Sequence, residues 1–223
     1  YRSNGDWNCP VVVRVPVGGY IHGSLCHSQS IESYFTHLPG IKIAYPSNAS
    51  DAKGLLKAAC RMNNPVLFFE HKGLYRQGYA TSQEPDEHYC LDFGVANIVQ
   101  SGNDLTIITW GALVQKSIEA SKKSSSDVEI IDLRTLNPLD LNIIIESIKK
   151  TNRVLVVHED NLTGGFGAEI VALINEHAFE LLDAPVKRVA SKDVPVAYSP
   201  ILENQILVQT DWIEEAIIKN INY

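Results

Sequence analysis

Residues 18–30 read Gly18-Gly19-Tyr20-Ile21-His22-Gly23-Ser24-Leu25-Cys26-His27-Ser28-Gln29-Ser30. This glycine-rich stretch follows an apolar run at residues 11–15, which predicts a buried strand. Apolar residues at positions 31, 34, 35 and 38 recur with helical spacing, so we expect a helix with one apolar face to begin near Ser30. The stretch is therefore a loop between a strand and a helix, and the rest of the chain is organised around this unit.

His27 is the residue of this loop with the clearest chemical potential. We expect it just before the N-terminus of the helix, with Ser28 or Ser30 as cap and Glu32 in the first turn. That position favours a neutral imidazole, which can accept or donate a proton near neutral pH. From the residues alone, a loop histidine that satisfies backbone groups is nevertheless favoured, because no carboxylate or nucleophile can be tied to His27 by spacing.

The composition is that of an ordinary globular protein. The chain has 223 residues, 45% of them hydrophobic and 20% charged, with a formal net charge of -7. The 19 Lys and Arg residues are scattered among 26 Asp and Glu residues, which argues against nucleic-acid binding. There is neither an apolar run of membrane-spanning length nor a secretory segment at residues 1–5, so we expect a cytoplasmic protein. Because residue 1 is Tyr and strand-like sequence follows almost at once, we expect a fragment of a longer chain.

The cysteines predict neither a metal site nor a redox motif. Cys9, Cys26, Cys60 and Cys90 contain no C-x-x-C pair, and reduced, mostly buried thiols are expected. A nucleophilic pair of Cys26 and His27 is disfavoured, because adjacent residues usually point in different directions.

The first 70 residues alternate between strand and helix patterns. Strands are expected at residues 11–15, 41–45 and 66–70, and a helix over residues 52–59 has Ser50 available as a cap. The run at 66–70 is continuously apolar, as is typical of parallel sheets covered on both faces. These elements predict half of an open α/β sheet, with further strands upstream.

A second α/β unit follows a polar, turn-rich segment at residues 71–92, which we interpret as a linker. The domains are accordingly expected at residues 1–92 and 93–223. The second unit is predicted to contain an edge hairpin at 95–100, strands at 105–110, 128–132, 154–158 and 186–190, and helices at 113–123, 140–150, 167–178 and 211–220. The whole chain is therefore assigned to the α/β class.

A glycine motif at residues 161–169 lies where a dinucleotide fingerprint would lie. After Gly165 and Gly167 the third glycine position holds Ile170, so a tight turn is favoured over a pyrophosphate site.

His158, Glu159 and Asp160 end a strand at the carboxyl edge of the second sheet, where a metal or a basic group of a partner could bind. Consecutive residues cannot all converge on one ion, so a solvated strand end is the favoured interpretation.

Several longer motifs, in order along nearly the whole chain, resemble a single family. They are Arg14-x-Pro16-x-Gly18-Gly19, His27-Ser28-Gln29-Ser30, Leu38-Pro39-Gly40-Ile41-Lys42, Asp51-Ala52-Lys53-Gly54-Leu55-Leu56, Asn64-Pro65, Ile131-Asp132-Leu133-Arg134-Thr135-Leu136-x-Pro138, Thr163-Gly164-Gly165-Phe166 and Ala184-Pro185. The chain thus resembles the beta subunit of the thiamine diphosphate-dependent decarboxylating component of 2-oxo acid dehydrogenase complexes, which is related to transketolase.

The resemblance implies a function for each part of the chain. Residues 1–92 would be the C-terminal part of a pyrimidine-binding domain with its linker, and residues 93–223 a transketolase-type C-terminal domain. The family decarboxylates a 2-oxo acid and transfers the acyl group to a lipoyl group on an acyltransferase. His27 matches the family's active-site histidine and would steady the substrate carboxylate or the lipoyl sulfur and pass a proton. Ser28 and Gln29 would set its orientation.

The resemblance also implies cofactors and partners that this stretch cannot supply alone. The glutamate that activates the aminopyrimidine and the aromatic residue that stacks on it belong upstream of Tyr1. The diphosphate and its Mg²⁺ are held by an alpha subunit or a fused alpha region. We therefore expect a heterotetramer-like assembly with a second copy of the chain, an acyltransferase partner, and no catalysis by this stretch alone.

A potassium site is a further implication of the resemblance. From the residues alone, the Asn63-Asn64-Pro65 corner beside Val11 is interpreted as a plain helix-to-strand turn. The family's K⁺ loop maps to the carbonyls of Val11, Ala59 and Asn64. Met62 stands where relatives usually carry Asp, which departs from the family pattern.

Four motifs look closer to branched-chain 2-oxo acid enzymes than to pyruvate enzymes. They are His22-Gly23, His27-Ser28-Gln29-Ser30, Leu74-Tyr75-Arg76 and His158-Glu159 with Leu162-Thr163-Gly164-Gly165-Phe166. The alternatives are a pyruvate dehydrogenase beta subunit and a non-catalytic module that docks the alpha subunit and acyltransferase. Transketolase and deoxyxylulose phosphate synthase are disfavoured, because the loop and turn motifs fit the oxo acid branch better.

Overall fold

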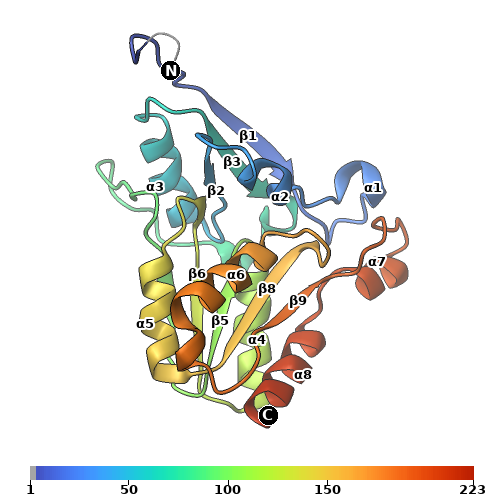
Figure 1. The fold of residues 1–223 in the computed structure, drawn as a ribbon. Helices are drawn as coiled ribbons and strands as arrows, with labels where there is room; N and C mark the ends of the chain where they lie inside the picture. The colour runs from blue at the N-terminus through green and yellow to red at the C-terminus, as the bar shows by residue number, and fades with distance from the viewer. Residues whose placement is uncertain (1–3) are drawn as a thin grey trace.

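The computed structural model describes residues 4–223 and contains two α/β units, each built around its own sheet (Figure 1). The first sheet has the strand order β1-β3-β2-β7 and the second the order β4-β6-β5-β8-β9. The expected α/β class is confirmed. The described part of the chain begins beside the first unit and ends beside the second, so the termini lie at opposite ends of the molecule.

The first sheet is parallel except at one edge. Its strands are β1 (Val12–Val17), β3 (Val66–His71), β2 (Lys42–Ala44) and β7 (Thr135–Asn137). β1 and β2 run parallel to β3, whereas β7 pairs with β2 in the antiparallel sense. β7 comes from the second half of the sequence, so that half contributes an edge strand to the first sheet, which the sequence did not predict.

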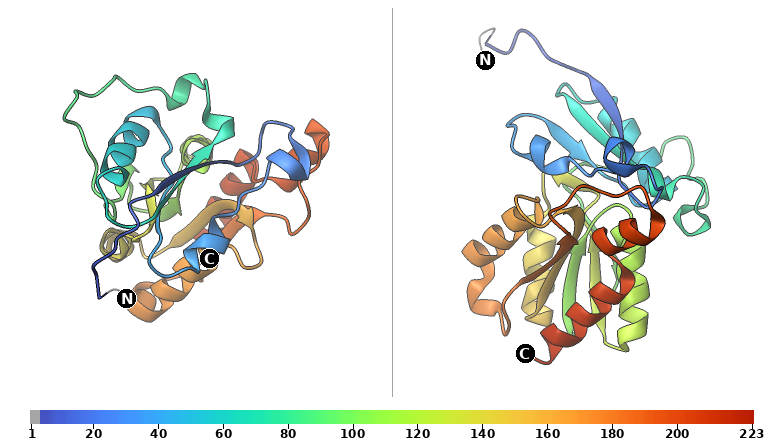
Figure 2. Two further views of the ribbon diagram at one scale, coloured as in Figure 1. Left: turned by 90° about the horizontal axis from the view of Figure 1, so that it is seen from above. Right: turned by 90° about the vertical axis from the view of Figure 1, so that its right-hand side faces the viewer.

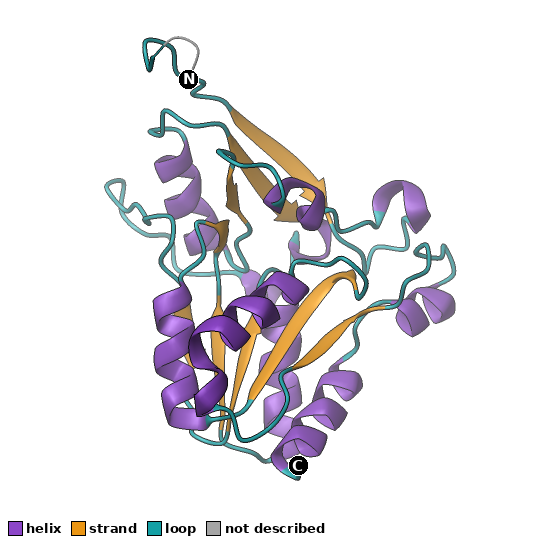
Figure 3. Cartoon of the chain, viewed as in Figure 1, coloured by secondary structure: helices purple, strands orange, loops and turns teal. Residues whose placement is uncertain are grey.

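The second sheet is covered by helices on both faces, as Figures 2 and 3 show. Its strands are β4 (Asn97–Gln100), β6 (Val128–Asp132), β5 (Leu105–Thr109), β8 (Val154–Asn161) and β9 (Lys187–Ser191). Its helices are α4 (Leu113–Ser124), α5 (Leu141–Thr151), α6 (Gly167–Ala178), α7 (Pro200–Ile206) and α8 (Thr210–Ile221). All of these elements except α7 lie within a few residues of the ranges predicted from periodicity.

Two apolar cores form because successive residues of β8 point to opposite faces. Val154 and Val156 pack in one core with residues of α5 and α6, while Leu155 and Val157 pack in the other with residues of α4 and α8. All four valine and leucine side chains are fully buried. The continuous apolar run of this strand therefore reflects a parallel sheet with two covered faces.

Three details of the sequence prediction are wrong. β1 is an edge strand with Val13 46% exposed, rather than a buried strand. β4 pairs with β6 instead of forming a hairpin with β5, which lies one strand further in. The thiols of all four cysteines are free, and these residues are exposed rather than buried.

The first long helix, α3 (Ala49–Ala59), begins with a side-chain cap. Asn48 accepts a hydrogen bond from the N–H of Asp51 at 3.0 Å, so Asn48 is the cap rather than the expected Ser50. The N–H of Ser50 instead donates to the hydroxyl of Ser82 at 2.7 Å, which ties the linker to this helix.

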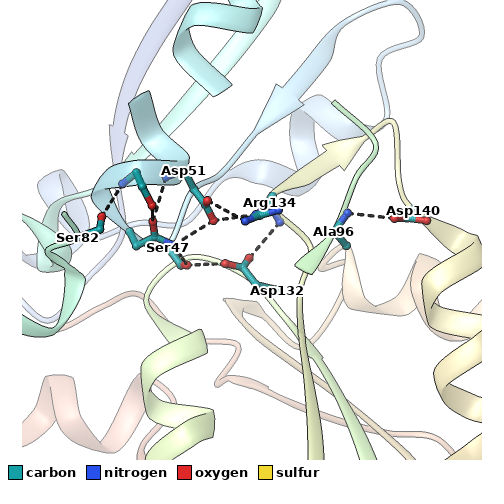
Figure 4. A network of polar contacts seen from close by, with 9 residues as sticks. Ser47, Asp51, Ser82, Ala96, Asp132, Arg134 and Asp140 are labelled. Carbon is teal, nitrogen blue, oxygen red and sulfur yellow. Dashed lines mark hydrogen bonds and ion pairs between the residues drawn. The ribbon is translucent and has the colours of Figure 1, made fainter. Parts of the chain in front are cut away.

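A buried ion pair joins α3 to the second unit (Figure 4). Arg134, in the turn between β6 and β7, donates to both carboxylate oxygens of Asp51, at 2.8 and 2.9 Å. The side chains of Asp51 and Arg134 are only 2% and 14% exposed. The carboxylate of Asp132 accepts hydrogen bonds from the hydroxyl of Ser47 and from the N–H of Arg134. This network holds the two units together on the side opposite the loop at residues 18–30.

We predict that Asp51→Asn lowers the free energy of unfolding by about 3 kcal/mol, because Arg134 loses its counter-charge in a mostly dry site. Urea unfolding followed by circular dichroism measures this loss in the full-length subunit. The matched control is Glu146→Gln, which removes an exposed pair with Lys149 and is expected to change stability by less than about 0.5 kcal/mol. Equal losses in the two variants would contradict the prediction.

Candidate functional site

The carboxyl ends of β1, β3 and β8 meet between the two units, and the loop at residues 18–30 lies at this junction (Figure 1). The N–H of Gly18 donates to the carbonyl of Gln29 at 2.9 Å, which closes the base of the loop. Open α/β sheets bind ligands at the carboxyl ends of their strands. The junction is therefore the part of the fold where a site is expected.

His27 is exposed in the loop, as the last residue of a four-residue helix, α1 (Ser24–His27). The next helix, α2 (Glu32–Thr36), has Ile31 as its N-cap residue and shows no side-chain cap bond in the described structure. The prediction that His27 directly precedes this helix, capped by Ser28 or Ser30, is therefore wrong.

Ser28 and Gln29, the residues expected to orient His27, bind the loop backbone. The hydroxyl of buried Ser28 accepts a hydrogen bond from the N–H of Gly23 at 2.9 Å. The carbonyl of Gln29 accepts the N–H of Gly18. The two residues thus fix the backbone on either side of His27, while their role toward its ring stays a prediction.

Glu159, at the end of β8, anchors the base of the loop. Its Oε1 accepts hydrogen bonds from the N–H of Gly19 at 2.6 Å and from the hydroxyl of Ser30 at 3.0 Å. Its Oε2 lies 2.6 Å from Nε2 of His71, the last residue of β3. Because Nδ1 of His71 accepts the N–H of Gly73, Nε2 carries the hydrogen and donates to Glu159.

The environment of Glu159 contradicts the interpretation of residues 158–160 as a solvated strand end. His158 is 0% exposed, and Glu159 and Asp160 are each 5% exposed. Burial raises the pKa of Glu159, but its contacts with His71, Gly19 and Ser30 outweigh that effect and hold the pKa below its usual value. The interpretation failed because β8 continues to Asn161 and its end is covered by the other unit.

The two glycines at the start of the loop leave no room for a side chain. A Cβ on Gly18 would lie 2.3 Å from Nε2 of His71, and Gly18 also has a φ of +85°. A Cβ on Gly19 would lie 2.2 Å from Cδ1 of Leu207. These close approaches let Glu159 and His71 reach the loop backbone.

A layer of uncharged groups lies beneath the loop. Buried Glu32 accepts a hydrogen bond from Nε1 of Trp110 at 3.0 Å, and burial together with the nearby Asp160 raises its pKa to about 8. The ring of His158 stacks on Trp110 with centroids 5.7 Å apart, and burial lowers its pKa to about 4. Near neutral pH, Glu32 is therefore largely protonated and His158 is neutral. Glu32 lies in the first turn of α2 as expected, but it is buried and does not supply a full negative charge there.

Two cavities adjoin these elements. One of about 960 Å³ is lined by Gln29, Ser30, Ile31, Ser33, Tyr34, His37, Asp160, Asn161, Thr163, Gly164, Asp193, Val194 and Pro195. The other, of about 520 Å³, lies between α3 and the linker and includes the Leu74-Tyr75-Arg76 motif and His71. Glu159 and His71 thus stand between the loop of His27 and the second cavity.

Known sequence families match most of the chain. Residues 1–77 match the pyrimidine-binding domain of transketolase, and residues 94–213 match the transketolase C-terminal domain. The chain is 46% identical over 221 residues to the 2-oxoisovalerate dehydrogenase subunit beta of Bacillus subtilis, covering 97% of this chain and 67% of that protein. The chain belongs to the family of beta subunits of 2-oxo acid dehydrogenases.

Pyruvate dehydrogenase E1 component beta subunits belong to the same group of relatives. Those of Bacillus subtilis and Cyanidium caldarium are 44% and 42% identical, over 89% and 100% of this chain and 62% and 68% of their own lengths. The chain therefore spans about two thirds of the length of these beta subunits. A split-gene transketolase solved as an inactive beta4 tetramer shares the fold, with a TM-score of 0.76 and 21% identity over 96% of this chain and 67% of that chain.

Two of the three carbonyls expected to bind K⁺ in this beta-subunit chain, those of Val11 and Ala59, already accept backbone hydrogen bonds. The Val11 carbonyl accepts the N–H of Val66 at 2.8 Å, and the Ala59 carbonyl accepts the N–H of Met62 at 3.1 Å. A carbonyl has two lone pairs, so this arrangement leaves one on each oxygen for a cation. The K⁺ site at Val11, Ala59 and Asn64 stays a prediction.

Other metal and membrane features are limited to what residues 4–223 show. Within that part of the chain, no three His, Cys, Asp or Glu side chains are grouped so that they could hold a metal ion. None of its helices has the length and apolarity needed to cross a bilayer.

The sequence reasoning missed His71, Glu159 and Glu32 as parts of the site. His71 was assigned to the linker, although it directly continues the apolar strand at residues 66–70. A usable signal was present, because His71 and Glu159 both end predicted parallel strands, and such strand ends are where polar site residues gather.

We predict that Glu32→Gln removes a pH dependence from stability. The Glu32 carboxyl has a folded pKa of about 8 against an ordinary value of 4.5, so the folded state binds the extra proton between these pH values. Its contribution to stability is present at low pH and falls by up to about 1.4 kcal/mol per pH unit as pH rises toward 8. The glutamine side chain of this variant mimics the protonated acid and can still accept from Trp110.

Urea unfolding of both proteins at pH 5.5 and 7.5 tests this prediction. From pH 5.5 to pH 7.5, the free energy of unfolding of the variant is expected to rise by about 2 kcal/mol relative to that of the wild type. Asp132, whose pKa is raised to about 7 by burial, is present in both proteins and cancels in the difference. A stability difference that does not change with pH would contradict the assignment.

Proposed function

We propose that this chain is the beta portion of a 2-oxo acid dehydrogenase that oxidatively decarboxylates a branched-chain 2-oxo acid of the 3-methyl-2-oxobutanoate type. The acyl group passes to a lipoyl group on an acyltransferase. The observation that carries the proposal is the 46% identity to a 2-oxoisovalerate dehydrogenase beta subunit over 97% of the chain. The His27-Ser28-Gln29-Ser30 and Leu74-Tyr75-Arg76 motifs support the branched-chain assignment.

His27 is the proposed catalytic residue. When bound, thiamine diphosphate supplies the carbanion chemistry by which a 2-oxo acid loses CO₂. The exposed imidazole of His27 steadies the substrate carboxylate or the lipoyl sulfur. During acyl transfer the lipoyl S–S bond breaks, one sulfur takes the acyl group, and His27 gives a proton to the other. Ser28 and Gln29 hold the loop so that the imidazole is presented in one position.

The remaining parts of the site are proposed to come from outside this chain. An upstream glutamate activates the cofactor's aminopyrimidine, and an alpha subunit or fused alpha region holds the diphosphate with Mg²⁺. Within residues 4–223, no three His, Cys, Asp or Glu side chains are grouped so that they could hold a metal ion. A second copy of the chain completes the assembly, with the domain boundary at residues 92 and 93. The support for this domain boundary is that it lies between the two matched family domains, at residues 1–77 and 94–213.

Pyruvate is the second candidate substrate, because beta subunits of pyruvate dehydrogenases are 42% and 44% identical to the chain. A non-catalytic docking module is a candidate of a different class. The acidic surface and the terminal helix α8 would suit a basic patch on a partner.

The substrate is tested by CO₂ release from the full-length protein with its alpha partner, thiamine diphosphate and Mg²⁺. We expect kcat/KM for 3-methyl-2-oxobutanoate to be at least about tenfold higher than for pyruvate, because pyruvate lacks the apolar groups that contact the pocket. A preference for pyruvate would keep the mechanism and overturn the branched-chain assignment. Absence of cofactor-dependent release in a folded assembly would favour the docking module.

We predict that His27→Ala slows acyl transfer to the lipoyl acceptor by at least about 100-fold, as expected when a positioned proton donor is lost. Decarboxylation measured with an artificial electron acceptor should fall by less than about tenfold. His88→Ala is the matched control, since the His88 side chain is 89% exposed in the linker, away from the loop. Normal lipoyl transfer in His27→Ala would refute the role of His27.

A further inference from the structure

The loop that carries His27 has an unusual backbone. Tyr20, His22 and Ser24 have φ values of 60°, 56° and 57°, a left-handed conformation that is uncommon for residues other than glycine. Three such residues within five positions persist only where surrounding contacts enforce them. The contacts that enforce this conformation therefore decide where His27 lies.

Glu203 of α7 contacts the loop at His22. Its side chain is 0% exposed, and its Oε1 accepts the N–H of His22 at 3.2 Å. Its Oε2 lies within ion-pair distance of His22, 2.6 Å from Nδ1, although this oxygen has no hydrogen-bond partner in the described structure. One buried carboxylate thus holds both the backbone and the ring of His22.

Gly23, which follows His22 in the chain, packs against His27 and Ser28. The N–H of Gly23 donates to the hydroxyl of Ser28 at 2.9 Å. A Cβ on Gly23 would lie 2.7 Å from Cβ of His27 and 3.0 Å from the hydroxyl oxygen of Ser28, so the backbone of Gly23 packs directly against both residues. A shift of His22 therefore moves the surface on which His27 rests.

The same C-terminal segment supports the loop at two further points. The hydroxyl of Tyr20 donates to the carbonyl of Val208 at 2.7 Å, and the hydroxyl of Ser24 lies 3.4 Å from the carbonyl of Val196. Figures 1 and 2 show α1 and α7 as neighbours on one side of the molecule. These two contacts use neutral groups, whereas Glu203 brings a buried carboxylate to the tip of the loop.

We propose that Glu203 is a positioning residue for the proton transfer by His27 and acts through His22 and Gly23. This inference rests on the proposed function. Glu203 does not touch the reacting groups; it holds the strained loop in the one conformation that presents the His27 imidazole. A buried carboxylate is suited to this task because it is costly to leave without partners, and both of its oxygens lie against His22, one accepting the N–H and the other close to the ring.

The test uses the assembled full-length enzyme with Glu203→Gln, His22→Gln and the double variant. Glutamine keeps the size of Glu203 but has one acceptor oxygen in place of two. We expect kcat for transfer to the lipoyl acceptor to fall about tenfold in each single variant, with KM for the 2-oxo acid changed less than about twofold, because the error is one of position. Because the two single changes remove the same contact, kcat of the double variant should lie within about twofold of kcat of either single variant.

Glu129→Gln is the matched control. Glu129 is also a buried carboxylate of the second unit, 1% exposed, but it binds Ser147 and Lys150, far in the fold from the loop. Its kcat should stay within about twofold of the wild type once folding is confirmed by thermal unfolding. Hydrogen exchange read by mass spectrometry should show faster exchange at residues 20–28 in Glu203→Gln and no change there in Glu129→Gln.

Several results would overturn the inference. Equal kcat in Glu203→Gln and Glu129→Gln would do so, as would losses that multiply in the double variant. A rise in KM with unchanged kcat would show a binding role instead. A wild-type enzyme without cofactor-dependent turnover would refute the proposed function, and unchanged exchange at residues 20–28 in Glu203→Gln would separately refute the contact itself.

Discussion

The buried carboxylate of Glu159 is the constraint on which the arrangement of the site depends. It accepts hydrogen bonds from Gly19 and Ser30 at the two ends of the loop and from His71 at the end of β3. A buried charge that loses its donors is costly, so these three groups and β8 cannot move independently. The close approach at the glycine pair and the meeting of the strand ends are both consistent with satisfying this one group.

The ionisable groups nearest to Glu159 add little charge to its surroundings near neutral pH. Glu32 is protonated up to a pKa of about 8 and His158 is neutral down to a pKa of about 4, so near neutral pH neither adds a full charge beneath the loop. On the other side of the junction, the ion pair of Arg134 and Asp51 fixes the second unit against α3. The buried carboxylates of Glu159 and Asp51 thus join the two units at two separate places, and the buried carboxylate of Glu203 adds a contact at His22 in the loop.

The sequence predicted helices and strands well where the local spacing of apolar residues and the helix- or strand-breaking residues determine them. The helix at 167–178 and the alternating cores of β8 follow from side-chain direction alone. The solvated interpretation of Glu159 was wrong because its partner His71 lies 88 positions away, and no local pattern reports such a contact. The same reason explains two further misses. The sequence did not predict that β7 joins the first sheet from the second half of the chain, or that Val13 is exposed at the edge of that sheet. His27 was proposed from a motif, whereas the carboxylates that contact its loop could be identified only from the fold.

The most direct test of this account is the coupling free energy between Glu159 and Ser30. It is obtained from the unfolding free energies of the full-length wild type, Glu159→Gln, Ser30→Ala and the double variant. A buried hydrogen bond to a charged group predicts a coupling of about 1.5 to 3 kcal/mol. Additive losses, with a coupling below about 0.5 kcal/mol, would show that Glu159 does not anchor the loop and would contradict the central claim.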